Sequence, residues 1–365
     1  MQKSLKVCYI LPDYNQKTDS HFFHVYEFLE KASQKADIFL IVEKSNVKTE
    51  DIKIANAVYV QKFKFIPLRF IESFIIILKA RIKGYKNFYT HYCYIGGVNA
   101  AIVSRVFGGK SYYWNCAMNW LFKKKDSSKI GYELSLKLSH YLVTGGEGMK
   151  QGYIEHYHLD PEKIKVMPNW INLERFQPAE APSSKEKTFL FVHWLSKRKG
   201  ADMIVPIVRH LNQDFQLKSV DYKLLVIGDG PYKDDLSREV EENKLKSVIK
   251  ILGPVPNEDI IEYYKKTDIF IMPSMEEGFP RVLLEAMAMG VPYVASDVGA
   301  VREISAETAQ RFLVKSGDVE MFAHKIENLL SDQKVYEAFR KEELQKVKEY
   351  SLEKVVNKFI ALFEL

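Results

Sequence analysis

The chain has 365 residues, of which 47% are hydrophobic and 27% are charged. This composition is typical of an ordinary globular protein, neither disordered nor membrane-spanning, and the length favours two domains of somewhat under about 200 residues each. The three cysteines, Cys8, Cys93 and Cys116, have no close spacing, so they predict neither a disulfide framework nor a zinc site. The net charge of +6 allows an anionic partner, but nothing beyond that charge points to nucleic acid.

The first residues lead directly into an apolar run, without the basic and apolar regions of an export signal. No apolar stretch is long enough to span a bilayer. We therefore expect a cytoplasmic protein, with peripheral attachment to the inner face of the membrane as a further hypothesis.

Short apolar runs rich in β-branched and aromatic residues alternate with longer amphipathic segments, a pattern typical of parallel sheets covered by helices. The strands predicted in the first half are 7–11, 38–42, 57–60, 88–90, 111–114, 141–144 and 164–167. Those predicted in the second half are 189–193, 223–227, 248–252, 269–272, 293–295 and 312–314. The pattern predicts an α/β fold with two doubly wound, Rossmann-like sheets.

Within the first half, residues 62–83 are basic and apolar, and five apolar side chains recur at helical spacing: Leu68, Ile71, Ile75, Leu78 and Ile82. Two interpretations stay open. The helix lies on an anionic membrane surface, or it covers the sheet in the ordinary way with its lysines in water.

The polar, proline-containing segment 177–184 is typical of a linker between domains. It predicts an N-terminal domain over 1–178, a C-terminal domain over 185–348, and a closing segment over 349–365. Ligands bind beyond the carboxyl ends of parallel strands, so two facing sheets would share a cleft.

Residues 273–292 carry the most informative pattern in the chain. After a predicted strand, Pro280 stands where a first helical residue is expected, and Gly290 stands where that helix should end. Free amides at the helix start, together with the flexible Gly278, favour a diphosphate. Glu277 lies just before the helix and Glu285 about one turn inside it, so their carboxylates can span a nucleotide sugar.

This segment closely resembles the retaining glycosyltransferases of family 4, whose signature is two glutamates separated by seven residues in a Glu-Gly-Phe context. The resemblance implies that Glu277 contacts the donor sugar and Glu285 the ribose. It adds Ser274, Gly278, Phe279 and Pro280 to the donor site. It also implies the GT-B architecture, in which two doubly wound domains face each other across a cleft. The C-terminal domain would bind the donor, the N-terminal domain the acceptor, and the final helix would cross back to the N-terminal domain.

Residues 189–200 resemble a second part of the same family. Lys199-Gly200 matches its Lys-Gly pair, whose cation neutralises the leaving diphosphate. His193-Trp194 stands where the family usually has Gly-Arg, which makes Arg198 the candidate for the missing charge and Trp194 a packing or stacking surface. Residues 252–255 resemble the loop that approaches the base, so Val255 joins the donor-binding candidates.

The N-terminal half departs further from the family. It lacks the glycine pair that often follows the first strand, and Asn115 stands where many members have a histidine. The acceptor-side candidates are Asp13, His21, His91 and Asn115. No spacing of histidine and carboxylate residues specifies a metal, so we expect neither metal nor cofactor, and a UDP- or GDP-sugar as the donor substrate.

The resemblance implies transfer of a sugar, with retention of configuration, to a saccharide or lipid-linked saccharide in cell-surface glycan or glycolipid synthesis. The leaving diphosphate would itself take the proton of the acceptor hydroxyl. Two alternatives stay open: a nucleotide-sugar epimerase of the same architecture, and a non-catalytic binding subunit with a decayed site. Trp194, Asn115 and the missing glycine pair favour the second alternative. The intact Glu277, Glu285 and Lys199 argue against it.

Overall fold

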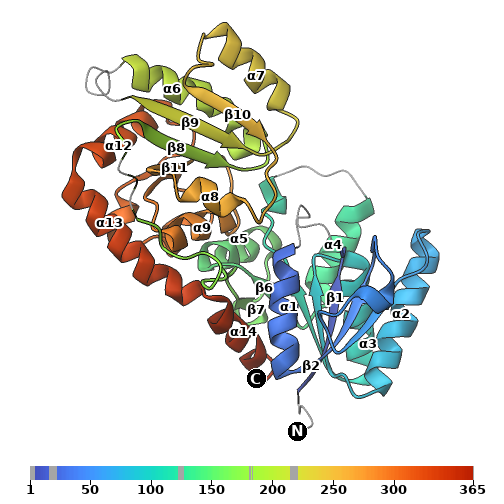
Figure 1. Cartoon of the computed structure of the whole chain (residues 1–365). Coiled ribbons are helices and arrows are strands. Elements are labelled where there is room, and N and C mark those ends of the chain that lie inside the picture. The colour runs from blue at the N-terminus through green and yellow to red at the C-terminus, as the bar shows by residue number, and fades with distance from the viewer. Residues whose placement is uncertain are drawn as a thin grey trace. The chain divides into compact units, whose positions relative to one another are not determined.

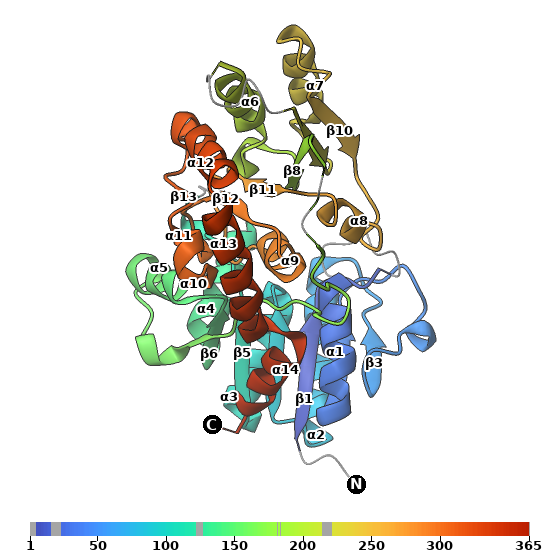
Figure 2. The ribbon, with the colours of Figure 1, turned by 60° about the vertical axis from the view of Figure 1, so that its left-hand side comes forward.

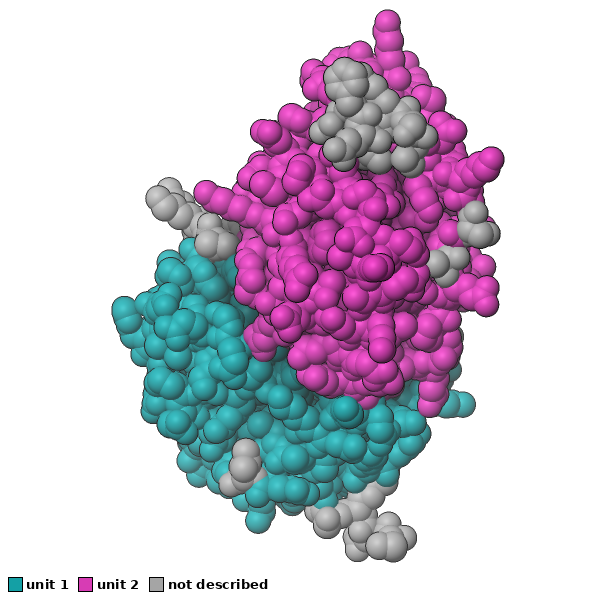
Figure 3. Space-filling view, turned by 90° about the vertical axis from the view of Figure 1, so that its left-hand side faces the viewer, with its two compact units in different colours: residues 1–168, 353–365 teal, residues 169–352 magenta. Residues whose placement is uncertain are grey.

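The computed structural model describes residues 5–15, 23–121, 127–180, 182, 184–213 and 221–364 (Figure 1). The chain divides into two compact units, which Figure 3 colours separately. Unit 1 comprises Met1–Pro168 and Glu353–Leu365, and unit 2 comprises Asn169–Leu352. All thirteen predicted strands are present, with their ends within two residues of the expected positions.

Unit 1 contains a sheet of seven strands in the order β3-β2-β1-β4-β5-β6-β7, paired in parallel throughout. The strands are β1 (Lys6–Leu11), β2 (Asp37–Val42), β3 (Ala57–Val60), β4 (Asn87–His91), β5 (Lys110–Trp114), β6 (Tyr141–Thr144) and β7 (Ile164–Val166). The helices are α1 (Phe23–Lys35), α2 (Ile66–Ile82), α3 (Tyr94–Phe107), α4 (Ser127–Leu138), α5 (Glu147–Tyr157) and α14 (Leu352–Ala361).

Successive side chains of a strand point to opposite faces of the sheet. Because both faces of this sheet carry apolar side chains, helices cover both of them. Cys8 and Ile10 of β1 belong to a core shared with α2 and α3. Tyr9, between them, contacts Phe359 of α14, and the Phe359 ring lies 5.1 Å from that of Phe28 in α1. Accordingly, α1 and α14 lie side by side in Figure 2.

Unit 2 contains a sheet of six parallel strands in the order β10-β9-β8-β11-β12-β13. The strands are β8 (Lys187–Val192), β9 (Tyr222–Ile227), β10 (Ile249–Gly253), β11 (Ile269–Met272), β12 (Tyr293–Ser296) and β13 (Leu313–Val314). The helices are α6 (Ile204–Gln213), α7 (Lys233–Glu242), α8 (Ile260–Tyr264), α9 (Arg281–Met289), α10 (Val301–Ile304), α11 (Glu307–Gln310), α12 (Val319–Ser331) and α13 (Gln333–Lys346). Strands β8 and β11 lie at the centre, so the loops that follow them are neighbours.

The boundary between the units differs from the predicted linker at 177–184. It lies between Pro168 and Asn169, and unit 2 ends at Leu352 rather than at residue 348. The residues after the boundary are held to unit 2 by hydrogen bonds: Asn169 Nδ2 donates to the carbonyl of Phe279 (2.8 Å), and Arg281 donates to that of Trp170 (2.9 Å). Within the proposed linker, residues 181 and 183 lie outside the described part of the chain.

Helix α2 is present as the sequence predicts, but a different row of side chains packs it on the sheet. Ile76, Ile77 and Ala80 enter the core of unit 1. Ile71 and Ile75, from the row that the periodicity singles out, are exposed, whereas Leu78 of that row is partly buried and packs against this core. Within the described residues, we find no helix with the length and apolar character needed to cross a membrane.

Candidate active site

The candidate site forms where the loops after β8 and β11 meet, at the carboxyl ends of two adjacent central strands. The β8 loop carries His193 and a short 3₁₀ turn, Lys197–Lys199. The β11 loop carries Ser274, Glu276 and Glu277 and leads into α9. Parallel sheets place ligand-binding residues at this edge.

Two glycines permit the close backbone approaches that hold the β8 loop in place. Gly200 has φ +73°, and a Cβ there would lie 2.1 Å from the carbonyl oxygen of Pro273 in the β11 loop. Gly228, after β9, has φ +138°, and a Cβ there would lie 1.9 Å from the carbonyl oxygen of His193. Only glycine has both this conformation and this space. The Lys-Gly pair therefore positions Lys199 through a backbone contact, and the turn at Gly228 supports His193.

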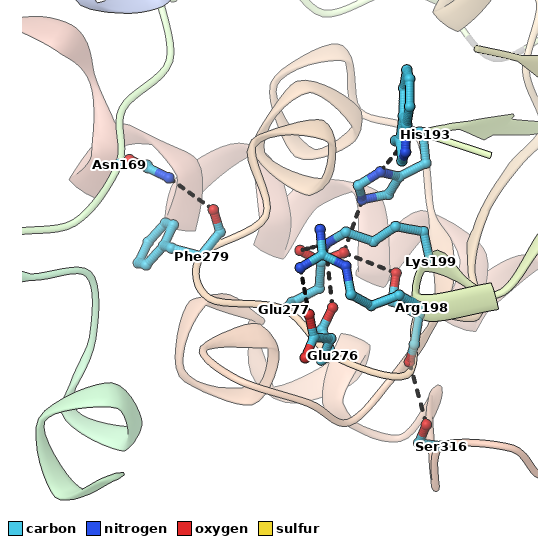
Figure 4. Close-up of polar contacts among 10 residues, drawn as sticks. Asn169, His193, Arg198, Lys199, Glu276, Glu277, Phe279 and Ser316 are labelled. Atoms are coloured by element: carbon cyan, nitrogen blue, oxygen red, sulfur yellow. Dashed lines mark hydrogen bonds and ion pairs between the residues drawn. The ribbon is translucent and has the colours of Figure 1, made fainter. Parts of the chain in front are cut away.

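Glu277 is the centre of the site. Its side chain is buried, and Figure 4 shows Lys199 and His193 directed toward it. The Oε1 atom lies 2.8 Å from both His193 Nε2 and Ser274 Oγ, and Oε2 lies 2.8 Å from Lys199 Nζ. Burial raises the pKa of Glu277, but the charges and hydrogen bonds of His193 and Lys199 outweigh burial and lower this pKa to about 2. Glu277 is thus a carboxylate at any physiological pH.

His193 is oriented by its own loop. The backbone N–H of Trp194 donates to His193 Nδ1 at 2.9 Å, so in the neutral ring the proton resides on Nε2 and is donated to Glu277. The sequence did not mark this residue, since it stands where the related family has a glycine. The Trp194 side chain is 56% exposed, so the indole is not a packing residue of unit 2.

Lys199 is nearly as buried as Glu277, with 8% of its surface exposed. Besides its ion pair with Glu277, its Nζ donates to the carbonyl of Glu276 at 3.3 Å. A buried ion pair of this kind contributes less to folding than its short distance suggests, because both charges lose hydration. The ion pair instead holds the Lys199 ammonium in a fixed position at the carboxyl ends of the strands.

Arg198 points to a different partner. Its guanidinium lies 2.6 Å from Glu276 Oε1, and its carbonyl accepts the N–H of Met275 at 3.0 Å. The Arg198 side chain is half exposed. The two loops are thus tied together, and a second cation stands beside Lys199 (Figure 4).

Glu285 lies about one turn inside α9, as its spacing from Glu277 predicts. It is buried, and its Oε2 lies 3.1 Å from the hydroxyl of Tyr264 in α8. Burial raises the pKa of Glu285, while Arg281, Tyr264 and Arg175 oppose that rise. The helix itself begins at Arg281, one residue later than predicted, because Pro280 is extended (φ −73°, ψ 115°). Gly290 ends the helix with φ +67°, as expected.

The other donor-side candidates fall into two groups. Ser274 joins the cluster directly through its hydrogen bond to Glu277. Gly278 and Phe279 shape the loop: the Gly278 carbonyl accepts the N–H of Ala300 at 3.0 Å, and the buried Phe279 ring packs edge-on against Tyr350. Pro280 is buried beside them, whereas Val255 is half-buried in the loop after β10.

The acceptor-side candidates do not form a comparable cluster among the described residues. His91 is buried, bonds Tyr9 through Nδ1 at 2.9 Å and stacks on Trp114. Asn115 is buried as well, and its Oδ1 accepts the N–H of Ala117 and the hydroxyl of Tyr153, both at 2.9 Å. These contacts give both side chains a structural role.

Asp13, after β1, is partly buried, and burial raises its pKa, with Lys44 opposing. His21 lies outside the described residues. In the described part of the chain, no group of three or more histidine, cysteine or acidic side chains is placed to hold a metal ion.

Comparison with solved structures identifies the fold of the chain. The crystal structure of Anabaena HepE in complex with UDP and glucose matches the chain with a TM-score of 0.79 over 99% of each chain, at 16% identity. At that identity the likeness establishes the fold. The chain therefore has the predicted GT-B fold, built from two doubly wound, Rossmann-like units.

Residues 173–346, nearly all of unit 2, match the family model of the glycosyl transferases group 1. D-inositol 3-phosphate glycosyltransferase of Streptomyces bingchenggensis is 25% identical over 219 residues, covering 56% of this chain and 48% of that protein. The UDP-Gal:alpha-D-GlcNAc-diphosphoundecaprenol alpha-1,3-galactosyltransferase of Escherichia coli is 26% identical over 262 residues, covering 64% and 67%. Over residues 173–346 the chain is therefore similar to the glycosyl transferases of group 1. The matched segments span 35% to 67% of the length of the curated relatives.

Proposed function

We propose that this protein transfers a sugar from a nucleoside diphosphate sugar to a saccharide or lipid-linked saccharide, with retention of anomeric configuration. The observation that carries the proposal is the buried Glu277 carboxylate, fixed by Lys199, His193 and Ser274. A second buried carboxylate, Glu285, lies one turn inside the following helix. Both occupy the positions of the two glutamates in the family 4 signature.

In this proposal each carboxylate binds a different part of the donor. Glu285 accepts hydrogen bonds from the ribose diol, and Glu277 accepts them from hydroxyls of the sugar. A carboxylate has about four acceptor sites, so Glu277 retains acceptor capacity beyond its three donors. Because Glu277 is already held on both oxygens, little side-chain entropy remains to be lost when the sugar binds.

The cations act on the diphosphate. Lys199, and Arg198 beside it, attract the diphosphate and stabilise the charge that grows on it as the bond to the sugar breaks. Fixed charges in a site shielded from water are the strongest form of such stabilisation. Where the family usually has an arginine, this chain has Trp194, and its neighbour His193 is turned toward Glu277 instead.

The chemistry then needs no protein base. The bond between the anomeric carbon and the diphosphate oxygen breaks, and that oxygen takes the proton of the acceptor hydroxyl. The acceptor oxygen forms its new bond on the face that the diphosphate leaves, which retains the configuration. We expect no metal requirement, since the cations perform the task that a divalent ion would have.

The names of the relatives support the choice of substrates. The E. coli relative is named for a UDP-Gal donor and a diphosphoundecaprenol-linked acceptor, and the HepE crystal contains UDP and glucose. We therefore propose a UDP-sugar as the first donor to test, a GDP-sugar as the second, and a lipid-linked saccharide as the acceptor. Acceptor binding by unit 1 remains part of the proposal.

Thermal unfolding with a panel of UDP-, GDP- and ADP-sugars tests the proposal. A donor present at a hundred times its Kd stabilises the folded state by about 2.7 kcal/mol, which raises Tm by several degrees. If no nucleotide sugar at millimolar concentration raises Tm, the protein is not a nucleotide-sugar enzyme. If a donor is converted to its epimer without any acceptor, the epimerase alternative is correct.

A further inference from the structure

Unit 1 exposes an unusual concentration of apolar side chains. Of the 16 large hydrophobic side chains that are exposed in the described part of the chain, eight lie between residues 63 and 82. They are Phe63, Phe65, Ile66, Leu68, Phe70, Ile71, Ile75 and Ile82. Scattered exposed apolar residues are ordinary on protein surfaces, whereas a contiguous set marks an interaction site.

These side chains do not take part in packing α2 on the sheet. At about 100° per residue, Leu68, Ile71, Ile75 and Ile82 lie on one side of the helix, and Ile76, Ile77 and Ala80 lie on the opposite side. The second row is in the core of unit 1. The first row, which we call the outer row, keeps 44% to 78% of each side chain exposed. One apolar face of α2 is therefore buried in the core of unit 1, and a second apolar face of the helix stays exposed.

The segment before the helix is fixed in a way that extends the outer row. Glu72 is buried, and its carboxylate accepts the hydroxyl of Tyr59 (2.9 Å) and the backbone N–H groups of Lys62 (2.9 Å) and Phe63 (3.2 Å). These bonds fold residues 62–63 onto the helix. Phe63, 47% exposed, is thus added to the apolar surface by a specific contact, and Phe65, two residues further on, is 66% exposed.

The charges around the outer row have a single sign. Five lysines between residues 62 and 86 are exposed: Lys62, Lys64, Lys79, Lys83 and Lys86. The one acidic residue in that range is Glu72, which is buried. The two arginines have local partners, since Arg69 pairs with Glu43 at 3.3 Å and Arg81 donates to the carbonyl of Gly108 at 2.6 Å.

From these observations we infer that the outer row of α2 and residues 62–65 dock on an anionic lipid bilayer. The helix lies in the plane of the surface, its apolar side chains reach the boundary of the acyl chains, and the lysines meet the anionic headgroups. In Figure 1, α2 lies with α3 along the outside of the unit 1 sheet, as such docking requires. A second copy of the chain is a poorer occupant, because a symmetric contact would bring five lysines against five. The inference does not depend on the donor chemistry.

Flotation of the full chain with vesicles tests the inference. At low salt, the protein should bind vesicles of phosphatidylglycerol and phosphatidylcholine, bind pure phosphatidylcholine far less, and lose binding at high salt. The variant Lys64→Gln/Lys79→Gln/Lys83→Gln should bind the anionic vesicles about a hundredfold more weakly, and so should Ile71→Gln/Ile75→Gln/Ile82→Gln. The matched controls are Lys334→Gln/Lys341→Gln and Met321→Gln, exposed changes in unit 2 that should bind as wild type does.

Thermal unfolding of each variant separates loss of docking from loss of fold, because the outer row does not pack in the core. An unchanged Tm together with weakened flotation supports the inference. It is overturned if the wild type does not float with anionic vesicles at low salt, or if the isoleucine variant floats as well as wild type. It is also overturned if the wild type is a dimer that the isoleucine substitutions dissociate, without any binding to vesicles.

Discussion

Replacing Lys199 by alanine tests the electrostatic part of the proposed mechanism. The change removes a buried ammonium 2.8 Å from Glu277 and leaves that buried carboxylate with His193 and Ser274. Removing one partner of a buried ion pair costs about 3–5 kcal/mol of folding free energy. Because His193 and Ser274 still donate hydrogen bonds to Glu277, we expect a cost near the lower of these values. The same ammonium should stabilise the developing diphosphate charge, so turnover should fall by one to three decades, or about 1.4–4 kcal/mol.

The assay is single-turnover transfer at saturating donor, combined with donor affinity by calorimetry and Tm for each variant. Lys199→Ala should lower turnover more than donor affinity, since the interaction strengthens in the transition state. Lys197→Ala is the matched control, an exposed lysine on the same 3₁₀ turn that should retain the wild-type rate. If Lys199→Ala is folded and transfers sugar at the wild-type rate, the diphosphate is stabilised by other groups and the scheme is wrong.

Two further predictions concern stability. Burial raises the pKa of Glu343 to about 7, so this group stabilises the fold fully below its unfolded pKa near 4.5 and loses that contribution as pH rises through 7. The free energy of unfolding of the wild type, measured in urea, should fall by up to about 3 kcal/mol between pH 5 and pH 8, and Glu343→Gln should remove most of this pH dependence. An equal pH dependence in both proteins would contradict the raised pKa of Glu343. Gly200→Ala should cost several kcal/mol and abolish transfer, because its Cβ meets a backbone oxygen at 2.1 Å, whereas Gly317→Ala, with φ +87° and open space, should cost only about 1 kcal/mol of strain. Equal losses of unfolding free energy for the two glycines would refute the proposed contact.

The sequence predicts the sheets well because their signal is local. Strands such as Ile269–Met272 are short apolar runs buried on both faces, and the run itself identifies them. The positions of Glu277 and Glu285 relative to helix α9 also follow from local rules, since Pro280 marks the start of that helix and Gly290 marks its end. The C-terminal segment, whose Phe359 packs on Tyr9, belongs to unit 1.

Two features of the site could not be predicted because they depend on contacts between distant residues. The bond of His193 to Glu277 joins positions 84 apart and requires the Trp194 N–H to orient the ring. Asn115 bonds Tyr153, 38 residues away, which gives it a structural use that its position after a strand does not reveal.

Helix α2 shows a different limit. Its periodicity correctly indicates an amphipathic helix, but the helix has two apolar rows, and hydrophobicity alone does not say which one faces the sheet. The row at Leu68, Ile71 and Ile75 has the larger side chains, yet Ile76, Ile77 and Ala80 are the ones that pack.

The central claim is that Glu277 and Glu285 bind different parts of one nucleotide sugar. The most direct measurement is calorimetric affinity for the free nucleoside diphosphate of whichever donor stabilises the wild type, made on wild type, Glu277→Gln and Glu285→Gln. Because the ribose is present with or without the sugar, Glu285→Gln should weaken nucleoside diphosphate binding about tenfold to a hundredfold. Glu277→Gln should leave that affinity within about twofold of wild type and still lose transfer. Equal losses of nucleoside diphosphate affinity in the two variants would contradict the account.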